Sequence, residues 1–306
     1  MKKLKEILPL MLKIVLGLVF IASAILKIVD MDQFEIYVYS YHFFSLNFSF
    51  LVARAAIIAE LALGIGLVSN CFHRLMWWGS VAMLIGYTLL LIYAQLIGRT
   101  DNCHCFGDVL QFNPWQSIIK NVVLMALFAL VYKEKGIRFR NDLLALAGVA
   151  LVSALAVFIV SPPDNFTSAY KPQQNLNVEL FDEALQQPPL DELNLNEGKK
   201  VVCFFSTACD YCQMSAHKLS LMQQFYGFPA ENICYVFMGS EEGKSRFYEL
   251  SQSQTYQDVI CEDVVNLLKI TNGVFPVILL LENGKVIHEY EFRSMNENEI
   301  ERFMRE

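Results

Sequence analysis

Long apolar runs fill the first half of the chain and constrain its fold more than any other feature. A helix needs roughly 20 mostly apolar residues to cross the hydrocarbon core of a bilayer. Five runs meet or approach that length, at about residues 8–29, 50–70, 75–97, 115–132 and 143–160. These runs account for much of the 55% hydrophobic content, because the remainder of the chain has ordinary globular composition. We therefore expect a membrane region followed by a soluble domain.

Basic residues in the short connections predict how the membrane region is oriented, because cytoplasmic loops are enriched in Lys and Arg. With the N-terminus in the cytoplasm, the outer connections at about 30–48 and 98–114 hold only Arg99. The inner connections hold the other basic residues, which are Lys2, Lys3, Lys5, Arg74, Lys133, Lys135, Arg138 and Arg140. Five crossings of the plasma (inner) membrane then place everything after residue 161 outside the cytoplasm, in the periplasm.

Three charged residues inside the apolar runs, Lys27, Arg54 and Glu60, are the intramembrane polar candidates. Charges within a span are costly, and they either pair inside the bundle or serve a function. Lys27 and Glu60 can pair between helices, whereas Arg54 and Glu60 are six residues apart and do not share one helical face. Two uses stay open: structural pairing, or a role toward a proton or a quinone. Lys120 lies near the end of a run, and we expect its ammonium group to extend toward the interface.

A polar segment, SPPDNFTSAYKPQQN at residues 161–175, predicts a tether between the membrane and soluble parts. The expected domains are a four-span membrane domain at 1–135, a fifth span with its linker at 136–175, and an extracytoplasmic domain at 176–306. The net charge of −7 and the lack of basic clusters interleaved with aromatic residues argue against nucleic acid as a partner.

Strands and helices alternate in the soluble part. Residues 200–205, 233–238 and about 259–260 predict strands, and residues 210–225, 242–251, 263–269 and 295–305 predict helices. The stretch VILLLENGKVIHEYE predicts a hairpin, because Asn283-Gly284 suits a two-residue turn. This order of elements predicts a small α/β domain with a mixed sheet.

The motif Cys209-Asp210-Tyr211-Cys212 connects the first of these strands to its helix. Unpaired N–H groups and the dipole at a helix N-terminus stabilise a thiolate and lower its pKa. The second cysteine lies one turn later, where it can resolve a mixed disulfide formed by the first. Zinc would need a second ligand pair, and although His217 is near, the sequence has no second CxxC or HxxxH. We therefore expect redox chemistry and no metal, with Cys209 attacking and Cys212 resolving.

The segment VVCFFSTACDYCQM, followed by GVFPVILLLENGKVI, resembles the thioredoxin fold over about residues 176–306. The resemblance implies that Pro276 is a cis-proline facing the CxxC motif. It also implies that Phe275 and Pro276, together with Asp210 and Tyr211, contact substrate peptides.

Cysteines outside the motif raise a separate expectation. Thioredoxins carry a buried acid six residues before the first cysteine of the motif, and Cys203 takes that place here. This difference affects the rate and redox potential, not the reaction type. Cys203 and Cys234 lie in predicted strands and are expected in the core, and Cys261 is expected to be a semi-buried thiol.

A second cysteine pair, Cys103 and Cys105, flanks His104 in the outer stretch DNCHCFGD. A CxC pair closes only a tight ring, so its disulfide is expected to be comparatively oxidising. Three uses stay open. The two cysteines could form a redox pair that exchanges with Cys209 and Cys212. They could instead bind a soft metal, copper or zinc, together with His104. The third alternative is a structural disulfide that cross-links the loop.

The membrane region carries VLGLVFIASAILKIVD, then AELALGIGL around Glu60, then CHCFGD before a fourth span. It resembles DoxX-like membrane proteins and, more closely, the methylamine-utilisation MauE family, over about residues 1–135. That resemblance implies disulfide formation in exported proteins, with both partners fused through a fifth span. The layout also resembles bacterial vitamin K epoxide reductase homologues. Those carry a CxxC within a span, which this chain lacks, so quinone reduction by that route is not expected.

These patterns predict a multi-pass α-helical membrane bundle followed by an α/β thioredoxin-like domain. The predicted function is a membrane-anchored thiol–disulfide oxidoreductase that acts on exported client proteins, in disulfide formation or maturation. Electrons would pass between the Cys209/Cys212 pair and the Cys103/Cys105 loop. The alternatives are a membrane scaffold or soft-metal delivery protein whose thioredoxin domain only binds clients, and a reductase running in the opposite direction. No cofactor is firmly indicated; a quinone or another membrane electron carrier is a candidate.

Overall fold

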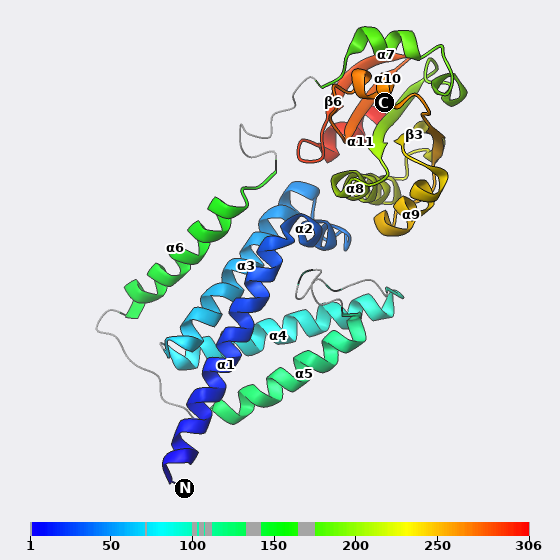
Figure 1. Cartoon of the computed structure of the whole chain (residues 1–306). Helices are drawn as coiled ribbons and strands as arrows, with labels where there is room; N and C mark the ends of the chain where they lie inside the picture. The colour runs from blue at the N-terminus through cyan, green and yellow to red at the C-terminus, as the bar shows by residue number, and fades with distance from the viewer. Residues whose placement is uncertain are drawn as a thin grey trace. The chain divides into compact units, whose positions relative to one another are not determined.

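The computed structural model (Figure 1) describes residues 2–70, 72–99, 103, 107, 112–132, 142–164 and 175–305. Side chains are described from residue 8 onward and, in the last membrane helix, from residue 146. The chain forms two compact units. The first is Met1–Tyr41 with Phe48–Pro163, and the second is His42–Asn47 with Asp164–Glu306.

The first unit is helical. Its long helices are α1 (Lys2–Val29), α3 (Leu46–Val68), α4 (His73–Leu96), α5 (Pro114–Val131) and α6 (Asp142–Val160). In α1, α3, α4 and α5 the apolar stretches are long enough to cross a membrane, which confirms the four predicted spans. The helix α6 is apolar apart from Asp142 at its start and Ser153, and its described side chains, Leu146–Val160, form a shorter stretch. That α6 is a fifth crossing therefore stays a prediction.

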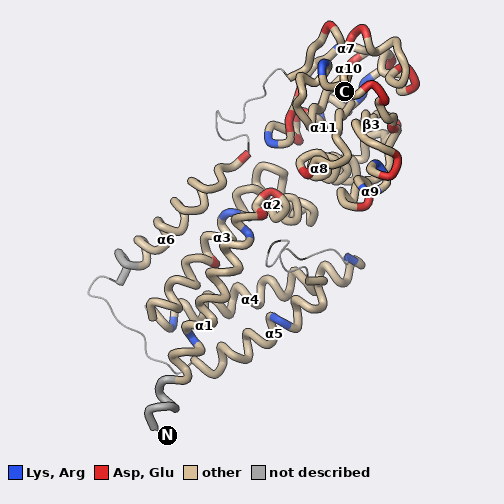
Figure 2. The backbone as a smooth tube through the Cα atoms, in the orientation of Figure 1, with Lys and Arg blue, Asp and Glu red and all other residues tan. Residues whose placement is uncertain are grey.

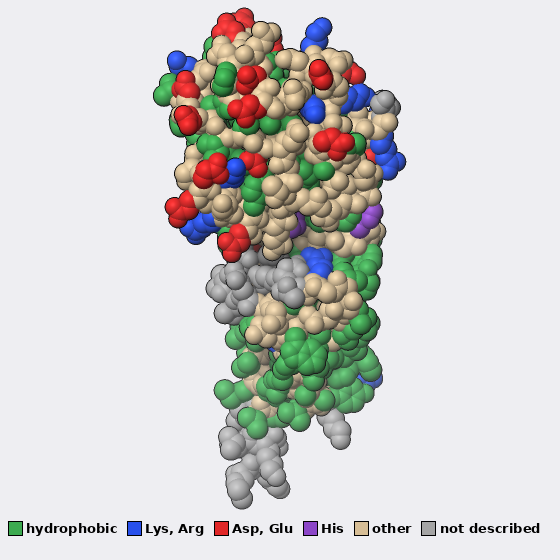
Figure 3. Space-filling view, turned by 90° about the vertical axis from the view of Figure 1, so that its right-hand side faces the viewer, with side chains coloured by type: hydrophobic (Ala, Val, Ile, Leu, Met, Phe, Trp, Pro, Cys, Tyr) green, Lys and Arg blue, Asp and Glu red, His purple; other side chains and the backbone are tan. Residues whose placement is uncertain are grey.

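The outer surface of these helices is apolar. Large hydrophobic side chains are exposed along α1, α4 and α5, including Leu18, Ile85, Leu89, Val123 and Leu130. Figure 3 shows such side chains gathered over the visible face of the membrane helices. Few charged residues lie on these helices, whereas the second unit carries many (Figure 2). Contact with lipid tails avoids the free-energy cost of exposing these apolar side chains to water.

A further helix, α2 (Met31–Tyr39), occupies the segment that we predicted as an outer connection. The prediction was incomplete, because a helix of 9 residues is too short to register as a span. Phe34, Ile36 and Tyr37 of α2 are buried in the first unit. The helix also carries the fully buried carboxylate of Glu35.

The second unit contains a five-stranded mixed sheet in the order β4-β3-β2-β5-β6. Strands β2 (Lys199–Ser206), β3 (Ile233–Met238) and β4 (Gln257–Ile260) are parallel. Strands β5 (Val277–Glu282) and β6 (Lys285–Tyr290) form the predicted hairpin, and β5 pairs antiparallel with β2. The predicted strands and the mixed sheet are thus confirmed.

Helices cover both faces of this sheet. They are α7 (Val178–Ala184), α8 (Asp210–Tyr226), α9 (Glu241–Ser251), α10 (Val264–Ile270) and α11 (Glu297–Arg305), with short 3₁₀ turns η2 (Leu190–Leu193) and η3 (Ala230–Asn232). Val202 and Phe204 of β2 pack in one core with α7 and α10. Phe205 points to the other face, where its ring lies 5.4 Å from that of Phe247 in α9. The central strand is therefore buried on both sides, which explains its continuous apolar sequence.

Glycines allow α1 and α3 to approach closely. A Cβ atom at Gly64 would lie 2.9 Å from the carbonyl oxygen of Gly17, and one at Gly17 would lie 2.9 Å from that of Gly64. Small residues at such crossings strengthen packing between membrane helices, where the hydrophobic effect contributes little. By contrast, a Cβ atom at Gly86 in α4 would meet nothing within 4 Å.

We predict that Gly64→Ala destabilises the membrane unit by about 1–3 kcal/mol, because the added methyl group forces two backbones apart. The measurement is the thermal unfolding midpoint of the purified chain in detergent. Gly86→Ala is the matched control and should leave the midpoint unchanged or slightly raised. An equal decrease of the unfolding midpoint in the two variants would show that the close contact between α1 and α3 does not limit stability.

Candidate active site

The CxxC motif begins α8 directly after the central strand. Cys209 is the N-cap residue of α8, and its sulfur accepts a hydrogen bond from the backbone N–H of Cys212 at 3.2 Å. The backbone N–H of Cys209 donates to the carbonyl oxygen of Ser206 at the end of β2, at 3.1 Å. Cys209 is partly exposed, whereas Cys212 is fully buried one turn later. A sulfur that attacks a partner disulfide must be accessible to that partner. A sulfur that resolves the mixed disulfide needs to be accessible only after the mixed disulfide has formed.

The two thiols of the motif differ in acidity. The hydrogen bond to the Cys212 side chain is the largest of the causes that lower the pKa of Cys209 to about 7, and the N–H groups of Cys212 and Tyr211 add to it. Partial burial and the Asp210 carboxylate oppose this shift. Burial raises the pKa of Cys212 far above its ordinary value. Near neutral pH, Cys209 is therefore substantially thiolate while Cys212 keeps its proton.

The loop before β5 lies beside the motif. The peptide bond between Phe275 and Pro276 is cis, as the thioredoxin resemblance implies. The Cys209 sulfur lies 4.0 Å from the carbonyl oxygen of Phe275. Asp210 and Tyr211 are exposed, and the Tyr211 ring lies 5.1 Å from that of Phe292. The structure thus places Phe275 next to Cys209 and leaves both central residues of the motif accessible.

The remaining thiols of the second unit are core residues. Cys203 and Cys234 are fully buried, as predicted. Cys234 packs with Val202 in the core against α7 and α10, so the alternation along β2 and β3 directs Cys203 to the opposite face. Burial raises the pKa of Cys203 well above its ordinary value. Cys261 is buried rather than semi-buried, because it packs against the α7/α10 core.

Cys103 is held at the N-terminal end of α5. It is nearly fully buried, its sulfur lies 2.8 Å from the Ser117 hydroxyl oxygen, and its backbone N–H donates to the carbonyl oxygen of Phe112 at 3.0 Å. The sequence analysis does not predict this contact between Cys103 and Ser117. The sequence indicates it only through the presence of a serine within an apolar run. Cys105 and His104 lie outside the described residues, so their pairing with Cys103 stays a prediction.

An ion pair joins α1 to α3 inside the membrane unit. The Lys27 ammonium lies 2.7 Å from a Glu60 carboxylate oxygen, and both side chains are almost completely buried. Lys27 also donates to the Ser23 hydroxyl at 2.7 Å. The sequence analysis left open whether Lys27 and Glu60 pair between helices, and the structure shows that they do. Each charge offsets the cost of placing the other in a medium of low dielectric constant.

Arg54 forms a second buried ion pair, with a partner that the sequence analysis missed. Its guanidinium binds the Glu35 carboxylate and donates to the carbonyl oxygens of Phe50, Ser161 and Pro162 at 2.9–3.0 Å. Glu35 was overlooked because its segment was expected to be a loop outside the spans. All three guanidinium nitrogens of Arg54 thus donate to protein oxygens, and a structural role for Arg54 stays a prediction.

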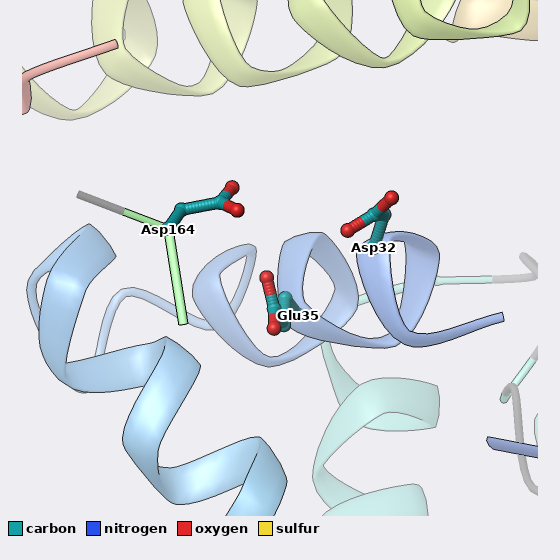
Figure 4. Close-up of side chains that lie close together, drawn as sticks. All are labelled: Asp32, Glu35 and Asp164. Atoms are coloured by element: carbon teal, nitrogen blue, oxygen red, sulfur yellow. The ribbon is translucent and has the colours of Figure 1, made fainter. Parts of the chain in front are cut away.

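Acidic residues lie near the ends of the membrane helices. Asp32 and Glu35 are one turn apart on α2, with carboxylate oxygens within 4.8 Å of each other (Figure 4). Asp164, also drawn in Figure 4, belongs to the second unit, where it pairs with Arg293 at 2.8 Å and Lys218 at 3.5 Å. Asp164, near the start of the predicted tether, is thus fully buried and paired with two cations, while the tether as a whole stays a prediction. Residues 165–174 lie outside the described part of the chain.

The sheet order, the CxxC motif at the start of α8 and the cis-proline beside it define a thioredoxin-like domain, here attached to a bundle of membrane-spanning helices. Residues 5–133 match the family described as methylamine utilisation protein MauE. The chain therefore joins a MauE-like membrane region to a thioredoxin-like domain. The fusion and fold class predicted from the sequence are confirmed.

Three known proteins are similar to all or part of this chain. The protein TlpB of Flavobacterium psychrophilum is 27% identical over 303 residues, covering 79% of each chain. The thioredoxin domain of a thiol-disulfide oxidoreductase from Bacteroides vulgatus is 20% identical, with a TM-score of 0.31 over 38% of this chain and 84% of its own. A thiol:disulfide interchange protein from Bacteroides sp. is 17% identical, with a TM-score of 0.31 over 37% and 78%.

We predict that alkylation of Cys209 by iodoacetamide rises with pH through a midpoint near 7, because only the thiolate reacts. In Cys212→Ala the midpoint should move up toward the ordinary thiol value of about 8.5, since the sulfur loses its side-chain hydrogen bond. Mass spectrometry of the peptide that contains residue 209 gives the rate at each pH. Cys261→Ala is the control and should keep the wild-type midpoint. An unchanged midpoint in Cys212→Ala would contradict this origin of the acidity.

Proposed function

We propose that this protein is a membrane-anchored thiol–disulfide oxidoreductase that acts on exported proteins. The observation that carries the proposal is the asymmetry of the CxxC pair. Cys209 is partly exposed, accepts the Cys212 N–H and has a pKa of about 7, while Cys212 is buried and protonated. The MauE-like membrane region supports an anchored protein.

The proposed direction is oxidation of client thiols. A client thiolate attacks the Cys209 sulfur of the Cys209–Cys212 disulfide and releases the Cys212 thiolate, which takes up a proton. A second client thiolate then attacks the client sulfur, so that a client disulfide forms and Cys209 leaves as a thiolate. Two electrons pass to the cysteine pair. The low pKa of Cys209 supports this direction, because it stabilises the reduced pair and makes its disulfide a stronger oxidant.

Client peptides would bind along the edge formed by the motif and the loop before β5. Phe275 and Tyr211 present partly exposed rings there, and Asp210 presents a carboxylate. The carbonyl oxygen of Phe275 lies near the attacking sulfur and can accept a hydrogen bond from an extended peptide. These three residues form the proposed substrate-binding surface, and Pro276 lies buried behind it in the same loop.

The reduced pair would be reoxidised through Cys103 and Cys105. Support comes from the location of Cys103 at the end of α5 in the MauE-like region. The proposal also includes five crossings, with α6 as the fifth, so that the thioredoxin-like domain lies in the periplasm, where disulfides persist. Exported proteins with thiols are then the clients.

We predict that Cys212→Ala accumulates a covalent complex with a model client peptide disulfide. In this reverse of the proposed reaction the Cys209 thiolate attacks the peptide disulfide, and no second thiol of the motif remains to release the peptide. Non-reducing electrophoresis of the full chain measures the complex, which dithiothreitol should dissolve. Cys209→Ala should form none. Cys261→Ala, which leaves the motif intact, should turn over like the wild type. A complex formed equally by Cys209→Ala would contradict the assigned roles.

We further predict that Cys103→Ser shifts the Cys209/Cys212 pair from oxidised to reduced in intact cells. Acid quenching and a mass-tagging maleimide report the state of the pair. Ser117→Ala keeps the Cys103 thiol and is the control, which should leave the pair mostly oxidised. A pair that is reduced in the wild type and oxidised in Cys103→Ser would reverse the proposed direction. No change in Cys103→Ser would contradict the relay.

A further inference from the structure

The exchange steps at the CxxC motif do not account for a cluster of three charged side chains in the second unit, Asp164, Lys218 and Arg293. One carboxylate oxygen of Asp164 accepts a hydrogen bond from the Arg293 guanidinium at 2.8 Å, and the other lies 3.5 Å from the Lys218 ammonium. The Asp164 and Lys218 side chains are both 1% exposed. One buried carboxylate thus faces two cations, and its removal would leave two like charges near each other. We call this group the Asp164 cluster.

The turn between β6 and α11 carries Arg293 and its neighbour Phe292. The Ser294 N–H donates to the Glu291 carbonyl oxygen at 3.2 Å, and the Glu291 N–H donates to the Ser294 hydroxyl at 2.8 Å. From α8, the Lys218 ammonium donates to the Phe292 carbonyl oxygen at 3.3 Å and lies 3.7 Å from the centre of the Phe292 ring. A cation at that distance is attracted to an aromatic face. Lys218 therefore holds both the backbone and the ring of Phe292.

The Phe292 ring contacts Tyr211, which is a residue of the CxxC motif. The two ring centres lie 5.1 Å apart, and the Arg293 guanidinium lies 5.8 Å from the centre of the Tyr211 ring. Such separations are typical of attractive aromatic pairs and cation–π contacts. Phe292 is 4% exposed, whereas Tyr211 is 45% exposed. The buried ring of Phe292 thus anchors the exposed ring of Tyr211.

Tyr211 also acts on the nucleophile through its backbone. Its N–H is one of the groups that lower the pKa of Cys209, together with the side chain and the N–H of Cys212. Partial burial and the Asp210 carboxylate oppose these groups. The N–H groups of the first helical turn have no acceptor within the helix, so their direction depends on how the turn is held. An anchored Tyr211 ring holds this turn beside the sulfur.

We propose that Asp164 is a positioning residue for thiol–disulfide exchange at Cys209. Its carboxylate fixes the two cations of the cluster, and these cations fix Phe292. The Phe292 ring then holds Tyr211 so that the Tyr211 N–H faces the Cys209 sulfur. Asp164 acts through this chain of contacts and touches no reacting atom. The inference rests on the proposed function, because it assumes that Cys209 is the attacking thiol.

The test is the pH midpoint of Cys209 alkylation by iodoacetamide in the full chain carrying Asp164→Asn. We expect the midpoint to rise by about half a pH unit, because the Tyr211 N–H no longer keeps its direction toward the sulfur. A direct electrostatic effect has the opposite sign, since two cations without the carboxylate would stabilise the thiolate. A lowered or unchanged midpoint therefore overturns the inference. Asp164→Glu keeps the carboxylate and should return the midpoint toward the wild-type value.

Asp258→Asn is the matched control. Asp258 in β4 also pairs with a lysine, Lys244 at 2.7 Å, and accepts a hydrogen bond from the Tyr248 hydroxyl at 2.9 Å. The change removes a carboxylate from a comparable pair in the same unit, so it reports the effect of lost stability alone. Its midpoint should equal that of the wild type. An equal rise in Asp164→Asn and Asp258→Asn would show that Asp164 has only a structural role.

Tyr211→Ala shows whether Asp164 acts through the tyrosine ring. This ring is 45% exposed, so the variant should fold even where Asp164→Asn does not. Its midpoint should rise by a similar amount. Adding Asp164→Asn to Tyr211→Ala should cause no further rise, because both changes act on the same turn. An unchanged midpoint in Tyr211→Ala, or additive rises in the double variant, would exclude the proposed chain of contacts.

Disulfide exchange of the wild type with a client peptide, measured in the same detergent, separates this inference from the proposed function. Exchange by the wild type with an unchanged midpoint in Asp164→Asn refutes only the positioning role. A raised midpoint in Asp164→Asn without exchange by the wild type refutes only the proposed function.

Discussion

Two hydrogen bonds from Cys212 lower the pKa of the Cys209 sulfur, and the bond from the Cys212 side chain contributes most. The other bond comes from the Cys212 backbone N–H. It exists because β2 ends just before the motif and α8 begins at Cys209, so that unpaired N–H groups of the first turn face the sulfur. The same turn buries Cys212 and keeps its proton in place. The sheet order matters for the same reason, since β5 pairs with β2 and brings the loop of Phe275 to this sulfur.

In the membrane unit the governing constraint is the lack of water. Each buried charge must find a partner within the bundle, because removing one partner of a buried pair leaves a charge that costs about 3–5 kcal/mol. Arg54 meets this demand completely through Glu35 and three carbonyl oxygens. Lys27 and Glu60 meet it through each other, yet they line a pocket. The two ion pairs therefore differ in their surroundings: Arg54 is bonded on all sides by protein oxygens, whereas Lys27 and Glu60 line a small pocket.

Local sequence patterns were sufficient for most elements. The strand at 233–238 and the hairpin around Asn283-Gly284 appear where apolar runs and turn residues predicted them. The short helices α2 and α7 were not predicted, and α2 lies in a segment that was expected to be an outer connection. The N-terminal position of Cys209 on its helix was also predictable, since it depends only on a strand, a motif and a helix in succession. The role of Glu35 was not, because its partner Arg54 lies in another helix.

The sequence by itself determined the two-part organisation, the four spans and the position of Cys209 at the start of its helix, because each depends on residues that are neighbours in the chain. Only the tertiary structure decided which charges pair and where the second thiol lies. Lys27 meets Glu60, Arg54 meets Glu35, and Cys103 meets Ser117 across separate segments. These contacts depend on the rotation and depth of whole helices against one another. That arrangement is set by packing over many side chains, including the close approach at Gly17 and Gly64, and no single stretch of sequence encodes it.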